Sequence, residues 1–128
     1  MAVFNPTLAA QTGSLSKVPV VFENVKEIEE LTKNNTDISK QDWDAHETSW
    51  DFQENELVRV FKEGKAKDLQ ATVSAYKEEW EKKFKQLHDN EEELNRQFIE
   101  IYGLQDELSP EVPYDEVTIL QQGEITIE

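Results

Sequence analysis

The sequence predicts a mainly α-helical fold in which short helices pack on one long central helix, as a helical hairpin or a small bundle. The long helix is predicted over residues 65–102, where nothing breaks a helix and apolar side chains recur at every seventh position. These side chains are Val73, Trp80, Leu87, Leu94 and Ile101. Gly103 then supplies the left-handed position at which many helices end.

We expect three shorter helices before the long one, at residues 24–34, 39–47 and 54–63. Each carries apolar residues at helical spacing. The polar stretch NNTD, residues 34–37, should break the chain between the first two, and Ser39 offers a hydroxyl that can cap the second. The short helices and the long helix together form one helical domain over residues 23–103.

The two ends of the chain are expected to differ from this domain. Residues 1–22 predict an irregular start followed by a short segment in VPVVF, which is either a strand at a sheet edge, because Pro19 cannot donate to a ladder, or merely extended. Residues 104–128 predict an acidic tail, in which two alternating runs around Gly123 suit a β-hairpin over residues 117–127.

The composition excludes several classes of protein. The 128 residues contain no cysteine, which excludes disulfides and thiolate zinc sites. No apolar run approaches the roughly 18 residues that cross a bilayer, and the start lacks the pattern of a secretory signal. We therefore expect a cytoplasmic protein without membrane contact. The formal net charge of −15 opposes the approach of nucleic acid phosphates.

We expect no catalytic, cofactor-binding or metal-binding residue in this chain. The four glycines form no loop that could cradle a phosphate. The two imidazoles, His46 and His88, lie far apart in the sequence, and such scattered histidines are mostly surface groups.

The stretch DWDAHETSWDF, residues 42–52, concentrates aromatic rings among carboxylates. Rings here and on the long helix could stack on nucleobases, or they could fix the short helices to the long one. Base-stacking platforms are interleaved with basic residues, whereas aspartates flank these tryptophans. We therefore predict a structural aromatic cluster. Its members are Trp43, Trp50, Phe52, Tyr76, Trp80 and Phe84.

Three segments resemble one known family. ISKQDWDAHETSWDFQENELV resembles the ISKxDWDxxETSWDFxxxPLL stretch of the PglX family, the large adenine-specific DNA methyltransferases of BREX phage-defence systems. NEEELNRQFIEIYGLQDELSPEVPYDEVTIL resembles a second hallmark of these proteins. FNPTLAAQTGSLSKVPVVF is similar to their NPTxNFxVGDIxxIPV segment, although QTGSLSKV stands where Val, Asp and Ile are usual. The resemblance covers nearly the whole chain, in the family's order.

The resemblance implies a parent enzyme that transfers a methyl group from S-adenosylmethionine to the N6 amine of adenine in DNA. Such enzymes use a glycine-bearing cofactor motif and an Asn-Pro-Pro-aromatic motif that grips the flipped base. Neither motif is present, since Asn5-Pro6 is followed by Thr7. The resemblance therefore implies an internal helical scaffold or spacer that binds no cofactor. It would contact the other domains of the parent, and DNA only through the parent.

Two other functions stay open at this stage. The long helix could serve as an autonomous coiled-coil interaction module, and it could also form a homodimer. The charge of −15 would suit an acidic DNA mimic, although Lys82, Lys83 and Lys85 interrupt any phosphate-like row on the long helix. The spacer is the favoured function.

Overall fold

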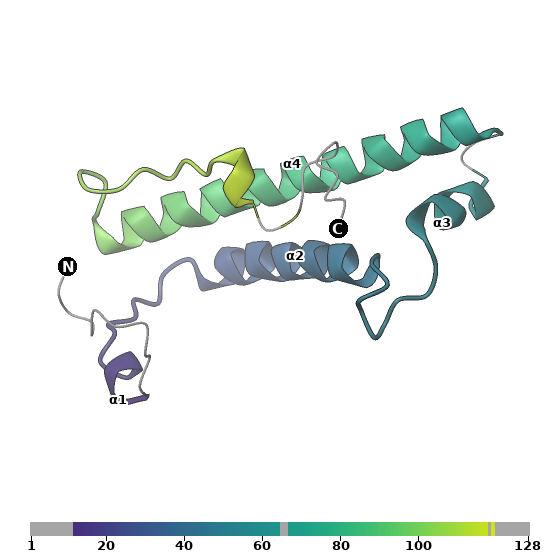
Figure 1. The fold of residues 1–128 in the computed structure, drawn as a ribbon. Helices are drawn as coiled ribbons and strands as arrows, with labels where there is room; N and C mark the ends of the chain where they lie inside the picture. The colour runs from purple at the N-terminus through teal and green to yellow at the C-terminus, as the bar shows by residue number, and fades with distance from the viewer. Residues whose placement is uncertain (1–11, 65–66, 118, 120–128) are drawn as a thin grey trace.

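The computed structural model describes residues 12–64, 67–117 and 119, and most of them are helical. The α-helices are α1 (Thr12–Leu15), α2 (Val25–Asp44), α3 (Glu56–Lys62) and α4 (Leu69–Tyr102), and a 3₁₀ helix, η1, covers Tyr114–Glu116. Helices α2 and α3 lie along α4, which runs the length of the molecule (Figure 1). The predicted mainly α fold with one long central helix is therefore confirmed.

Helix α4 is delimited by a residue at each end. The side chain of Asp68 accepts a hydrogen bond from the Ala71 amide at 2.7 Å, so the helix begins at Leu69, later than the predicted residue 65. Gly103 follows its last residue with φ 67°, and the Leu104 amide donates back to the Ile99 carbonyl at 2.9 Å. This left-handed ending satisfies carbonyls that the helix would otherwise leave unpaired.

Helix α2 is continuous through residues 34–37, and the predicted break there is wrong. Asn and Asp favour helix ends because their side chains compete for the local backbone. Here the Nδ2 of Asn90, on α4, donates to the side-chain oxygens of Asn34 and Asn35, each at 2.8 Å. Because Asn90 binds the side-chain oxygens of Asn34 and Asn35, these oxygens do not compete for the backbone of α2. The contact between the two helices thus overrides the local preference for a helix end.

The core is built from three segments of the chain. Its buried residues are Ile38 of α2, Trp80, Phe84 and Leu87 of α4, and Val117 and Ile119 of the C-terminal segment. After Gly103 the chain turns back along α4 (Figure 1). Hydrogen bonds fix this return: His88 Nε2 lies 2.8 Å from the Val112 carbonyl, and the Val112 amide donates to Glu92 Oε1 at 3.1 Å. The C-terminal segment is thus a third layer of the fold.

The ends of the chain only partly fall within the described residues. Of the two alternatives for VPVVF, residues 18–22, the edge strand is absent, because neither a helix nor a strand covers this segment and no strand occurs anywhere in the described part of the chain. Without a neighbouring strand to pair with, an extended segment forms no ladder. Most of the hairpin predicted over 117–127 lies outside the described residues. No helix in the described ranges is long and apolar enough to cross a membrane.

Candidate functional site

The structure divides the predicted aromatic cluster between the interior and the surface. Trp80 and Phe84 are buried in the core, and Tyr76 packs against it. Phe52 is half-buried but lies outside the core cluster. Trp43 is 58% exposed and Trp50 is fully exposed. These two tryptophans do not clamp the short helices onto α4, which corrects the prediction for both.

The continuity of α2 explains the position of Trp43. Ile38 is the residue of α2 that is buried against α4. Trp43 follows it by five residues in the same helix, which places its side chain about 140° further around the helix axis. In an unbroken α2, Trp43 therefore lies at the edge of the contact with α4, where it lines a groove with Leu87 and Leu94 and stays largely exposed.

Trp50 lies in a turn after α2 whose backbone is held in place by side chains. Ser49 is buried, its Oγ donates to Asp44 Oδ1 at 2.6 Å, and it accepts a hydrogen bond from the Asp51 amide at 3.1 Å. Lys40 forms ion pairs with Asp44 and Asp51. The turn therefore presents Trp50 to solvent from a fixed backbone.

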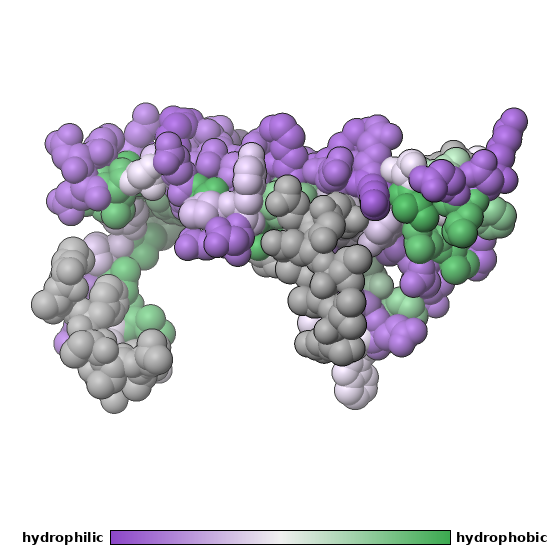
Figure 2. Space-filling model, turned by 45° about the horizontal axis from the view of Figure 1, so that its top comes forward, coloured by the Kyte–Doolittle hydropathy of each residue, from purple (hydrophilic) through white to green (hydrophobic). Residues whose placement is uncertain are grey.

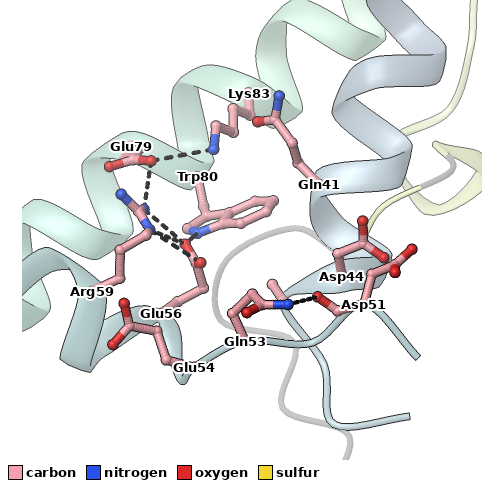
Figure 3. Close-up of a pocket in the computed structure, with 11 residues that line it drawn as sticks. Gln41, Asp44, Asp51, Gln53, Glu54, Glu56, Arg59, Glu79, Trp80 and Lys83 are labelled. Atoms are coloured by element: carbon pink, nitrogen blue, oxygen red, sulfur yellow. Dashed lines mark hydrogen bonds and ion pairs between the residues drawn. The ribbon is translucent and has the colours of Figure 1, made fainter. Parts of the chain in front are cut away.

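A cleft of about 540 Å³ lies beside this turn, where α2, α3 and α4 converge (Figure 3). Arg59 of α3 is its central cation. Its Nη2 donates to Glu56 at 2.7 Å and to Glu79 of α4 at 2.8 Å, and its Nη1 donates to Glu63 at 2.7 Å. The indole Nε1 of Trp80 donates to Glu56 Oε2 at 3.3 Å. These contacts join α3 to α4 through a network of ion pairs.

The charges of this network stabilise each other. The hydrogen bonding that Arg59 donates to Glu56 is the largest of the effects that raise the pKa of Arg59, and Glu63 and Glu79 add to it. Burial acts to raise the pKa of Glu79, but the hydrogen bonds and charges of Lys83 and Arg59 together outweigh it and lower that pKa. The ionised forms are thus favoured on both sides, as in a structural ion-pair network. The arrangement holds two helices together and shows no poised acid–base pair.

Glu79→Gln tests the contribution of this network to stability. The folded-state pKa of Glu79 lies below its ordinary value of 4.5, so its stabilising effect is complete above that value and disappears as the pH falls through the folded pKa. We expect the variant to lose about 1 kcal/mol of unfolding free energy at neutral pH. Urea unfolding at neutral pH and near pH 3 should show this deficit shrinking in acid. An equal deficit at both pH values would contradict the role assigned to the carboxylate.

The two histidines are both engaged with backbone carbonyls. His46 Nδ1 lies 2.6 Å from the Asp42 carbonyl, and His88 makes the contact with Val112 described above. Within the described ranges, no group of three or more His, Asp or Glu side chains is placed to hold a metal ion.

Comparison with known proteins relates the chain to adenine-specific methyltransferases. The chain is 34% identical over 120 residues to the adenine-specific methyltransferase PglX of Lacticaseibacillus casei (strain Zhang). The match covers 93% of this chain and 10% of that protein, so the chain spans about a tenth of the relative's length. No family model and no solved structure matches. The resemblance to a segment of a PglX-type methyltransferase, predicted from the sequence, is confirmed.

Proposed function

We propose that this chain is a helical spacer within a DNA adenine N6-methyltransferase of the BREX phage-defence type, and that it carries no catalytic residue of its own. In this proposal it sets the distance and the angle between other parts of the enzyme. The observation that supports it best is the distribution of apolar side chains along the molecule. They are exposed near both ends of α4, and hydrophilic side chains cover much of the coloured surface between them (Figure 2), where Trp43, Trp50 and Tyr114 are the exposed exceptions.

At one end, the segment before α2 meets the last turn of α4. The Tyr102 hydroxyl donates to the Pro19 carbonyl at 2.9 Å and accepts a hydrogen bond from the Val21 amide at 3.2 Å. Phe22 beside them is 81% exposed, and Val20 is exposed as well. Side chains of this size in water mark a surface that binds another protein or domain.

At the other end, α3 packs on the beginning of α4 through one side only. Val60 is buried in this contact, whereas Val58 and Phe61 point away from it and are exposed. Leu69, the first residue of α4, is 75% exposed. Since α4 has 34 residues and rises about 1.5 Å per residue, the two apolar ends are about 50 Å apart. A spacer must be rigid and must bind a neighbouring domain at each end, and a long helix with exposed apolar side chains near both ends meets these two requirements.

The middle of α4 argues against the coiled-coil alternative. Its apolar side is already buried under α2 and the C-terminal segment. Its outer side carries ion pairs one turn apart, such as Lys82 with Glu78 at 2.8 Å and Lys85 with Asp89 at 2.6 Å. These lysines also interrupt the row of carboxylates that a DNA mimic would need. A coiled-coil partner or a homodimer would need a second apolar stripe along this surface.

The proposal assigns S-adenosylmethionine, the DNA contacts and the methyl transfer to other parts of the parent protein, in the cytoplasm. This chain contains no Asn-Pro-Pro-aromatic motif, and its charge of −15 opposes contact with phosphates. The residues of this chain would act by holding the other parts of the enzyme at a fixed distance and angle to one another. Such positioning matters, because a displacement of about 1 Å can reduce a rate on the order of 100-fold.

A segment exchange tests the proposal. The 120 matching residues of the L. casei methyltransferase are replaced with the corresponding residues of this chain, and site-specific adenine methylation is measured. We expect activity within about tenfold of the parent, because 34% identity over 120 residues predicts the same fold for the two segments. The matched control carries a Gly/Ser segment of equal length, which behaves as a flexible coil and should abolish methylation. Full activity of that control would show that no rigid spacer is needed.

A further inference from the structure

The exposed side chain of Trp50 has no role in the fold of the described chain. Large aromatic rings are seldom left wholly in water, and they are the residues that most often carry the binding energy of interfaces. The backbone beneath this ring is held by Ser49, Asp44 and Asp51, so the point from which the ring projects is fixed before any partner arrives. Fixed aromatic anchors lose little conformational freedom on binding. Trp50 therefore has the properties of an interface anchor.

The charge around Trp50 defines the chemistry of its partner. Residues 41–58 contain six carboxylates and no lysine or arginine. Three cations pair with this stretch, namely Lys40, Arg59 and Lys62, and Arg59 is shared with Glu63 and Glu79 outside it, so the surface around Trp50 is net negative. Glu47, three residues before Trp50, is exposed. A surface that receives Trp50 must therefore be apolar at its centre and basic at its rim, because electrostatic complementarity selects the partner.

The small contact area that Trp50 offers indicates that its partner belongs to the same polypeptide. One exposed indole and its acidic rim fall well short of the area that two separate proteins bury in a stable complex, about 800 Å² on each side. A partner on the same polypeptide needs much less contact area, because the connection between the parts raises their effective concentration. The chain matches only a tenth of its relative, which leaves ample protein to supply such a surface.

We propose that Trp50 inserts into an apolar pocket rimmed by lysine or arginine on another part of the same methyltransferase polypeptide. This inference rests on the proposed spacer function and identifies one contact through which the spacer would be held. A nucleobase is a poorer occupant, since DNA phosphates would approach the acidic rim of the turn.

Hydroxyl-radical footprinting of Trp50 tests the inference in two proteins, the isolated chain and the segment-exchange methyltransferase described above. We expect Trp50 to react at least about tenfold more slowly in the methyltransferase, because docking removes the ring from water. Trp80, which is buried in the chain itself, should react slowly in both. Equal reactivity of Trp50 in the two proteins would overturn the inference. Protection that arises only when DNA is added would also overturn it, and would assign the ring to a base.

A charge-reversal variant tests whether the pocket that receives Trp50 has a basic rim or is merely apolar. Glu47→Lys should raise the reactivity of Trp50 in the methyltransferase by about threefold or more, because it places a cation opposite the basic rim. Glu81→Lys, at an exposed carboxylate in the middle of α4, is the matched control and should leave Trp50 protected. No effect of Glu47→Lys would overturn the basic character of the partner.

The methylation rate of the same protein distinguishes this inference from the spacer function on which it rests. An active enzyme with a reactive Trp50 would refute the docking contact alone. An inactive enzyme with a protected Trp50 would leave the contact in place and refute the spacer function. An inactive enzyme with a reactive Trp50 would refute both.

Discussion

Replacing Trp80 with alanine is expected to lower the free energy of unfolding of the chain by about 3–5 kcal/mol. Trp80 is 4% exposed and packs in the core with Ile38 and Phe84. Its indole nitrogen also contacts Glu56 of α3, and the ammonium group of Lys83 lies 4.3 Å from its ring. One side chain thus joins three helices. Urea unfolding followed by far-ultraviolet circular dichroism measures the loss.

Trp50→Ala is the matched control for that variant. It removes a ring of the same size that contacts solvent only, so the free energy of unfolding should change by no more than about 0.5 kcal/mol. Comparable losses for the two variants would contradict the placement of Trp50 at the surface.

The long helix could be predicted from the sequence because its signals are local and agree with one another. The seven-residue recurrence that includes Trp80 and Leu87 extends over four repeats, from Val73 to Ile101, and both residues are buried in the core. Gly103 directly follows the last helical residue, in the conformation that glycine adopts most easily. No distant residue has to be known to interpret either signal.

The continuity of α2 could not be predicted, because the residue that secures it is 55 positions away in the sequence. Asn34 and Asn35 favour a helix end when they are considered alone. Only the fold reveals that Asn90 bonds to both of their side chains. The error then extended to the aromatic residues, since the direction of Trp43 depends on whether α2 is one helix or two.

The role of the C-terminal segment was also missed. Its acidic composition indicated a tail, yet Val117 and Ile119 complete the core beside α4. The apolar residues were visible in the sequence, but an apolar pair in a short segment does not specify which surface it covers. Tyr114, whose ring centroid lies 4.8 Å from that of His88, shows that this return also passes over a polar part of α4.

Inserting two alanines between Glu81 and Lys82 is expected to reduce site-specific methylation by the segment-exchange methyltransferase on the order of 100-fold or more. Both flanking residues are exposed, and alanine preserves the helix. The insertion rotates the part of α4 that carries Trp80 and the contact with α3 by about 200° relative to the part that carries Phe84 and Leu87, so it also takes Trp80 out of register with the rest of the core. The two apolar ends of the rod would then face different directions. Binding of S-adenosylmethionine by the other parts of the enzyme should remain unchanged.

The matched control inserts the same two alanines after Asp106, in the exposed turn that follows α4, where they leave the rod intact. Circular dichroism of both isolated variants checks that each keeps its helical content. The measurement that tests the spacer most directly is the ratio of the methylation rates of the two insertion enzymes, with cofactor affinity determined for each. The spacer proposal predicts a large deficit for the α4 insertion alone, at equal cofactor affinity. Equal methylation rates would contradict the claim that α4 sets the geometry of the enzyme.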